Sequence, residues 1–126
     1  MKDRENFFEV WGGISGCQHL LSLLLNSDLR PNQIAQLTSE NVATRFRISE
    51  KGGIALGKDA DLSLIDPKAD EVIAGESLFY RHRQTPYLGR TLRGRVVRTI
   101  LRGQTIFRDG KLQARPTGKL VTPTRS

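Results

Sequence analysis

Apolar residues in the first part of the chain recur at helical spacing. Positions 17, 20, 21, 24 and 25 predict a helix over residues 17–26, with Ser15 as its N-cap. Pro31 suits the first turn of a second helix that reaches residue 37. Ser39 is placed to cap a third helix, whose apolar face would carry Val42, Ala43 and Phe46. The pattern therefore predicts three short helices within residues 1–48.

After Lys51-Gly52-Gly53 the pattern changes to short strands punctuated by Gly, Asp and Pro. Residues 60–66 alternate and end in Asp66-Pro67, which predicts a short strand that runs into a turn. Residues 95–101 and 105–107 are rich in apolar and β-branched residues and predict two further strands. Asp109-Gly110 is a strong signal for a two-residue hairpin turn. The tail from residue 116 is rich in turn residues, and we expect it to be loosely ordered.

Three or four short strands are too few to close a β-sandwich. Their open edges and one apolar face would need partner strands from elsewhere. With helices first and strands second, the pattern favours an α+β fragment of a larger fold.

Composition narrows the class of protein. A chain of 126 residues with 37% hydrophobic residues fits one small folded domain. Its longest near-apolar stretch, residues 20–25, is far shorter than the roughly 20 residues of a membrane span. The N-terminus lacks a signal-type apolar run, and the single Cys17 supports neither a disulfide framework nor a zinc pattern. We therefore expect a cytoplasmic protein that has no membrane partner.

Charge divides the chain unevenly. Residues 1–80 hold 8 Lys/Arg and 12 Asp/Glu, a net charge of −4, whereas residues 81–126 hold 12 Lys/Arg and one Asp, a net charge of +11. Four arginines at positions 93, 95, 98 and 102 make a basic nucleic-acid-binding module one alternative. Against it, Phe107 alone is a poor stacking platform, and the acidic first part offers an internal partner. An assembly module that binds by strand addition is a second alternative.

Few side chains suggest chemistry. Trp11-Gly12-Gly13 lies between an apolar, strand-like piece and the first helix, where glycine lets the main chain turn sharply or approach a ligand. We interpret His19 as structural, and His82 as a surface or domain-interface residue. Cys17, on the apolar helix face, is expected to be a packed thiol.

Three stretches, taken in order and spacing, resemble the C-terminal third of allantoinase and of its cyclic amidohydrolase relatives, the hydantoinases and dihydroorotases. They are residues 7–16 around Trp11-Gly12-Gly13, residues 51–62 from Lys51-Gly52-Gly53 to Leu62, and residues 78–90 followed by the hairpin at 95–109. The second stretch is shared across the superfamily. The first and third favour allantoinase over its relatives.

The resemblance implies a parent enzyme with a (β/α)8 barrel that opens a cyclic amide ring, allantoin to allantoate. Hydantoinase, dihydropyrimidinase and dihydroorotase activities remain alternatives. The parent would use divalent zinc-type metals bridged by a carboxylated lysine, with every metal ligand upstream of Phe7. This chain would then contain no catalytic and no metal-binding residue, and we expect it to be inactive alone. The backbone of Trp11, Gly12 and Gly13 would border the substrate in the intact enzyme.

The resemblance also implies a domain division. Residues 1–48 would be the last loop and helices of the amidohydrolase barrel, and residues 49–126 the C-terminal part of the small β-sandwich domain with a basic tail. The expected partners are the missing N-terminal barrel part and further copies of the chain.

Overall fold

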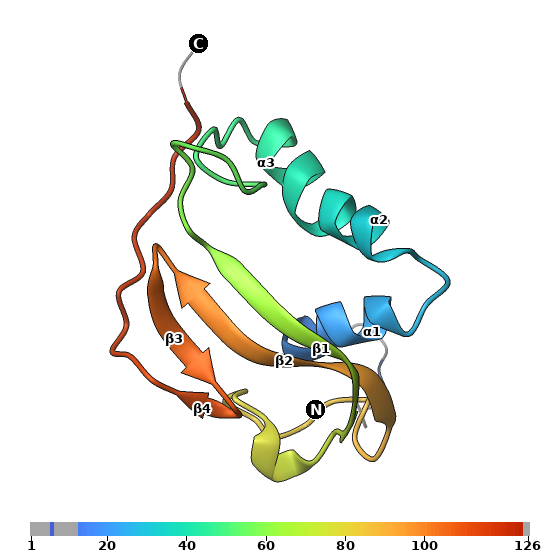
Figure 1. Cartoon of the computed structure of the whole chain (residues 1–126). Coiled ribbons are helices and arrows are strands. Elements are labelled where there is room, and N and C mark those ends of the chain that lie inside the picture. Colours follow the sequence, from blue (N-terminus) through green and yellow to red (C-terminus); the bar gives the residue numbers. More distant parts are fainter. Residues whose placement is uncertain (1–5, 7–12, 125–126) are drawn as a thin grey trace.

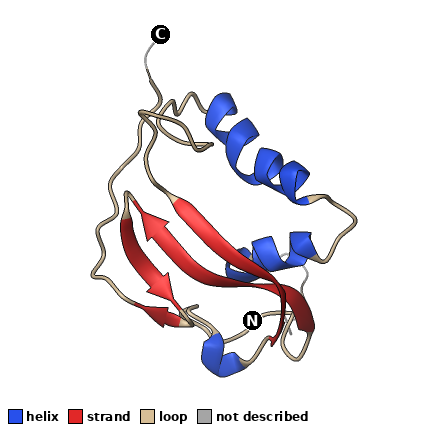
Figure 2. Cartoon of the chain, in the orientation of Figure 1, coloured by secondary structure: helices blue, strands red, loops and turns tan. Residues whose placement is uncertain are grey.

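The computed structural model describes residues 6 and 13–124. In this part of the chain, the helices of residues 17–45 lie on one side of a four-stranded antiparallel sheet, and a short 3-10 turn, Gly75–Ser77, lies at its lower end in the view of Figures 1 and 2. The chain is thus α+β, with its helices first and its strands second, as the pattern predicts.

The first helical segment consists of a 3-10 turn, Cys17–His19, followed by α1, Leu20–Leu25. Its location is as predicted, but the predicted cap and buried face are wrong. Gly16 occupies the N-cap position without a side-chain hydrogen bond. The buried positions carry polar side chains, His19 and Ser22, whereas Cys17 and Leu20 are exposed. The tighter 3-10 turn shifts the helix face away from the one that α-helical spacing indicates.

The predicted second and third helices form one continuous helical segment. It runs through α2 (Pro31–Ala35), a π-helical turn (Gln36–Glu40) and α3 (Asn41–Arg45). Pro31 occupies the first turn, as expected, but Ser39 lies inside the segment and caps nothing. Since no glycine or proline interrupts residues 32–51, the backbone continues in the right-handed helical region. Ile34 and Ala43 are buried, whereas Leu37, Val42 and Phe46 are exposed.

Gly52 holds the return from this helical segment close to it. Its φ is +89°, and a Cβ atom built there would lie 2.5 Å from the Cβ atom of Ala43. A side chain at residue 52 would therefore be strained and would push the loop away from α3.

The sheet has the order β1-β2-β3-β4, with strands Leu62–Val72, Thr91–Leu101, Gln104–Arg108 and Lys111–Leu112. The predicted turn at Asp109-Gly110 is confirmed. Arg108 pairs with Lys111, and both turn residues have positive φ, 48° and 81°. This is the backbone that a type I′ hairpin turn needs.

Strand β1 corrects the prediction that the chain turns at Asp66-Pro67. The strand continues to Val72 through an irregularity between Asp66 and Asp70. Proline is tolerated because β1 is an edge strand and the ladder is already interrupted there. Asp66 Oδ1 accepts a hydrogen bond from the Lys68 N–H at 2.9 Å. β2 likewise begins at Thr91, four residues before the predicted start.

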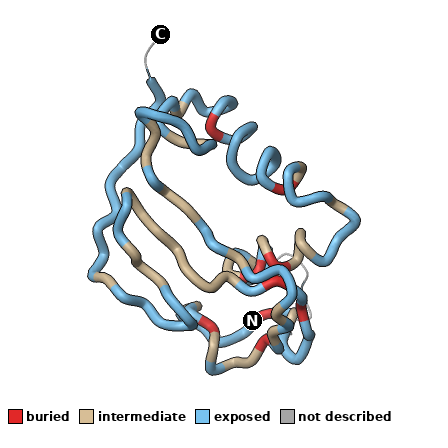
Figure 3. Tube along the Cα trace, in the orientation of Figure 1, coloured by how far each residue is buried: buried red, intermediate tan, exposed pale blue. Residues whose placement is uncertain are grey.

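The core is small. Ile73, Leu78 and Leu92 are buried, and Leu23, Tyr80 and Tyr87 pack against them. Leu23 belongs to α1 and Leu92 to β2, so helix and sheet share this core. Much of the remaining chain is exposed (Figure 3). Many large apolar side chains are exposed, among them Leu20, Leu37, Phe46, Ile54 and Leu56.

Residues 113–124 have no regular secondary structure but are tied to both halves of the chain. Arg102 donates to the Thr117 carbonyl at 2.6 Å, and the Thr124 N–H donates to the Arg47 carbonyl at 2.8 Å. No helix in the described part of the chain is long and apolar enough to cross a membrane.

Candidate substrate-side loop

Of the three predicted substrate-side residues, Trp11 and Gly12 lie outside the described residues. Gly13 is exposed, with a φ of +81°. A Cβ atom built there would meet nothing within 4 Å, so glycine is favoured at this position by backbone conformation and not by crowding. The space beside the Cα atom of Gly13 is thus open.

The residues after Gly13 are held by a distant segment. The Thr85 hydroxyl donates to the Ser15 carbonyl at 2.6 Å, and Thr85 is only 8% exposed. A Cβ atom at Gly16 would lie 3.6 Å from Cε2 of Tyr87, which places the Tyr87 ring beside this glycine. The loop therefore lies against the segment that precedes β2.

Gln18 extends this contact. Its side-chain amide donates from Nε2 to the Ser77 carbonyl at 2.8 Å and accepts at Oε1 from the Phe79 N–H at 2.9 Å. The backbone N–H of Gln18 donates to the Tyr80 hydroxyl at 2.8 Å. Residues 15–18 thus make four hydrogen bonds to residues 77–85.

This anchoring was not predicted from the sequence. Gln18 lies in the 3-10 turn that opens the first helical segment, where a polar residue is typical of a solvent-facing position, and its partners are about 60 residues away. The signal that could have indicated the contact is the resemblance itself. The stretches that favour allantoinase, 7–16 and 78–90, are the two that Thr85 and Ser15 join.

His19, Cys17 and His82 do not form a reactive site. His19 is 7% exposed, and burial lowers the pKa of its ring against the opposing effect of Glu71. Its buried position supports a structural role, whereas Cys17 is exposed, which corrects the expected packed thiol. His82 is exposed. Across the described ranges, no group of three His, Cys, Asp or Glu side chains could hold a metal ion, so these residues do not fit the metal centre that the resemblance implies.

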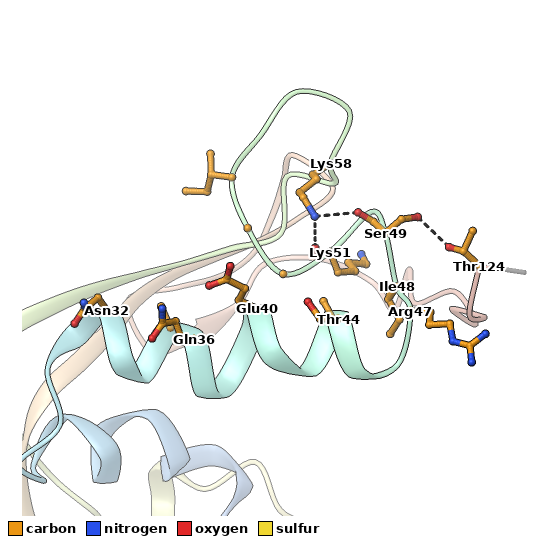
Figure 4. Close-up of a pocket in the computed structure, with 15 residues that line it drawn as sticks. Asn32, Gln36, Glu40, Thr44, Arg47, Ile48, Ser49, Lys51, Lys58 and Thr124 are labelled. Atoms are coloured by element: carbon orange, nitrogen blue, oxygen red, sulfur yellow. Dashed lines mark hydrogen bonds between the residues drawn. The ribbon is translucent and has the colours of Figure 1, made fainter. Parts of the chain in front are cut away.

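A groove of about 880 Å³ lies between the helical segment and the loop at residues 48–58 (Figure 4). Asn32, Gln36, Glu40 and Thr44 line one side along the helix. On the other side, the Lys58 ammonium donates to the carbonyls of Ser49 (2.9 Å) and Lys51 (2.7 Å). Since Lys58 is engaged with the loop's own backbone, it stabilises the loop.

Lys51 joins this loop to the sheet. Its ammonium contacts Asp59 at 2.6 Å and also Asp61, and these hydrogen bonds raise its pKa. Burial raises the pKa of Asp61, but the hydrogen bonds from Lys51 and the Arg102 N–H outweigh burial, so that its pKa is lowered. The Lys51–Asp59–Asp61 cluster is therefore an ion-pair joint between the helical end and the β2–β3 turn.

The arginines that suggested nucleic acid have local partners. Arg98 donates to the Thr105 hydroxyl, with Nε at 2.9 Å, and Arg102 to the Thr117 carbonyl. Arg93 lies 3.9 Å from Asp70 on β1. Arg95 is opposite Asp66 in the strand register. Two arginines of β2 thus lie opposite acidic residues of β1, whereas Arg98 and Arg102 bind uncharged groups.

Comparison with known proteins places the chain in a family. The profile of the amidohydrolase family matches residues 8–106. The chain belongs to the amidohydrolase family. Among curated amidohydrolase relatives, it is 52% identical to an allantoinase of Rubrobacter xylanophilus over 99% of its own length, and 46% identical to one of Desulfitobacterium hafniense over 93%. It spans 29% and 27% of those two proteins.

Solved structures agree with this assignment. A Thermus D-hydantoinase (dihydropyrimidinase) matches 94% of this chain with a TM-score of 0.87 and 26% identity. A second D-hydantoinase covers 88% with a TM-score of 0.81 and 27% identity. The chain spans 28% and 25% of these structures. The expected resemblance to allantoinase and the hydantoinases is thus confirmed, with markedly higher identity to the allantoinases.

Proposed function

We propose that the chain is the C-terminal part of an allantoinase-type amidohydrolase that opens the cyclic amide of allantoin to give allantoate. The observation that carries this proposal is the 52% identity to an allantoinase over 99% of the chain. The aligned region covers 99% of the chain and so includes both stretches that favour allantoinase, and these stretches contact each other through Thr85 and Ser15. Ring opening of hydantoins or dihydropyrimidines is the second candidate, supported by the fold similarity to the D-hydantoinases.

Within that enzyme, residues 1–48 would complete the barrel and residues 49–126 would supply strands to the sandwich domain. The main chain of Trp11, Gly12 and Gly13 would border the substrate ring and hydrogen-bond its amide groups. Glycine suits this role because a backbone without Cβ can come close to a ligand. In this proposal the chain's contribution is to bind and orient the substrate.

The proposed enzyme requires a barrel part beyond this chain. Exposed apolar residues on the helices, such as Leu20, Leu37 and Phe46, would be covered by that part or by further copies of the chain. Cover of this kind would also occupy the edge of β1, which in the described chain pairs only with β2.

Co-expression tests the proposal. The R. xylanophilus allantoinase lacking the segment that this chain matches would be produced with and without this chain, and both preparations assayed for allantoin opening. We expect a complex that copurifies and recovers activity absent from either part. Copurification without activity would argue against the substrate-side role, and failure to associate would argue against the domain assignment.

A further inference from the structure

We infer that residues 77–87 form a clamp that positions the described part of the substrate-side loop, residues 13–18, with Gln18 and Thr85 as its positioning residues. The inference rests on the proposed function, because the loop's substrate is assigned there. The clamp consists of the four hydrogen bonds between residues 15–18 and residues 77–85, together with the contact of Tyr87 with Gly16.

Each bond of the clamp fixes main chain. Thr85 holds the carbonyl of Ser15, Tyr80 holds the N–H of Gln18, and the Gln18 amide holds backbone groups of Ser77 and Phe79. A loop that binds through its backbone needs this kind of support, since side-chain contacts alone would leave its peptide groups free to rotate. Gly13 and Gly16 make this loop costly to order, and anchoring it in advance reduces that cost upon binding.

The clamp is itself anchored in the core. Ser77 and Phe79, the two backbone partners of Gln18, flank Leu78, which is 5% exposed and packs with Ile73 and Leu92. Residues 77–79 are therefore fixed by apolar packing on one side and by the Gln18 amide on the other. The loop position thus depends on a side chain whose amide binds backbone groups of the protein.

Substitution of Gln18 in an active enzyme tests the inference. A chimera would carry this chain in place of the matching segment of the R. xylanophilus allantoinase. Gln18→Met keeps the side-chain length and removes both amide bonds. The matched control is Gln33→Met, because Gln33 Oε1 also accepts two hydrogen bonds, from Arg30 N at 3.0 Å and Nε at 3.2 Å, but lies in α2.

For Gln18→Met we expect KM for allantoin to rise about 5- to 30-fold, the factor for one to two hydrogen bonds, with a smaller change in kcat. Gln33→Met should leave KM within about twofold even where it lowers the melting temperature. Equal effects of the two substitutions on KM, or a Gln18→Met effect confined to stability, would overturn the inference.

Thr85 gives an independent pair of variants. Thr85→Val removes the hydroxyl that holds the Ser15 carbonyl and keeps the shape, whereas Thr85→Ser keeps the hydroxyl. We expect KM to rise in the valine variant and to return toward the parent value in the serine variant. A serine variant as impaired as the valine variant would show that packing, and not the hydrogen bond, matters at this position.

Amide hydrogen exchange on the chimera separates failure of the clamp from failure of the proposed function. If the unmutated chimera is inactive, the proposed function fails, but the clamp still predicts slow exchange of the Gln18 and Phe79 amides. Gln18→Met should speed exchange at Phe79, and Tyr80→Phe at Gln18, each by about tenfold. Unchanged exchange at both amides would overturn the clamp.

Discussion

Leu25 of α1 lies so close to Gly94 of β2 that a Cβ atom on Gly94 would be 2.7 Å from Leu25 Cδ1. The Ser22 hydroxyl also donates to the Gly94 carbonyl at 2.9 Å. Gly94 has a φ of +89°, which favours glycine independently of the crowding. The helix therefore docks on the strand at a point where a side chain would separate them.

Gly94→Ala should lower the free energy of unfolding by about 2–4 kcal/mol, because it combines backbone strain with overpacking. Gly103→Ala is the matched control. Gly103 has a φ of +81° but open space around its Cβ position, so only the strain, about 1–2 kcal/mol, applies. Urea titration at one protein concentration would compare the two variants. Equal losses of unfolding free energy would contradict the close packing of Leu25 on Gly94. Adding Leu25→Ala to Gly94→Ala should relieve the steric part.

The ion-pair joint at Lys51 makes stability depend on pH in the acidic range. The pKa of Asp61 is lowered in the folded chain, so its carboxylate stabilises the fold above the unfolded pKa of about 3.9. That contribution is lost as pH falls through the folded pKa. Lys51→Met should cost about 1 kcal/mol at pH 7 and flatten the loss of stability below about pH 4.

Lys68→Met controls for the removal of a positive charge, since Lys68 is exposed on β1. Urea midpoints at pH 7, 4.5 and 3 would compare the two variants with the parent chain. A pH profile for Lys51→Met parallel to that of the parent would contradict the role of Asp61.

Part of the fold could be predicted from the sequence. The Asp109-Gly110 turn and the start of a helix at Pro31 depend on backbone preferences of the residues themselves, and both are confirmed. Ser39 failed as a cap because capping requires a helix to begin there, and nothing in residues 36–41 interrupts the preceding one. The prediction of a turn at Asp66-Pro67 is wrong because an edge strand tolerates proline.

The clamp depends on long-range contacts that local patterns do not encode. Gln18 meets Ser77 and Phe79 only because the 3-10 turn directs it toward them and Leu78 fixes their backbone. The burial of His19 and Ser22 has the same origin, since Ser22 becomes favourable inside only once Gly94 offers its carbonyl.

The chain alone should be oligomeric, strand-swapped or only marginally stable. Leu20, Leu37 and Phe46 are each more than half exposed, at 53%, 52% and 60%, and the buried core has few residues. Light scattering and thermal melting of one sample would measure this. A monodisperse monomer with a sharp melt at an ordinary mesophile temperature would show that these residues close a core unaided.

The chain alone should also fail to open allantoin and to bind zinc in a one-to-one ratio. The described residues bring no three ligand side chains together, and a hydrolytic zinc site needs about three. Metal analysis after dialysis, combined with a ring-opening assay, would test this. Equimolar bound metal with turnover would place a catalytic centre inside the chain and contradict the assignment.

The most direct test of the substrate-side role compares two chimeras of the R. xylanophilus allantoinase. One carries this chain, and the other carries the matching segment of the Thermus D-hydantoinase, which shares its fold at a TM-score of 0.87. Because the host supplies the same barrel to both, any difference in kcat/KM for allantoin comes from the exchanged segment. We predict that the chimera with this chain is better by at least about tenfold, or 1.4 kcal/mol in transition-state binding. Equal kcat/KM in two folded chimeras, or a higher value with the hydantoinase segment, would contradict the account.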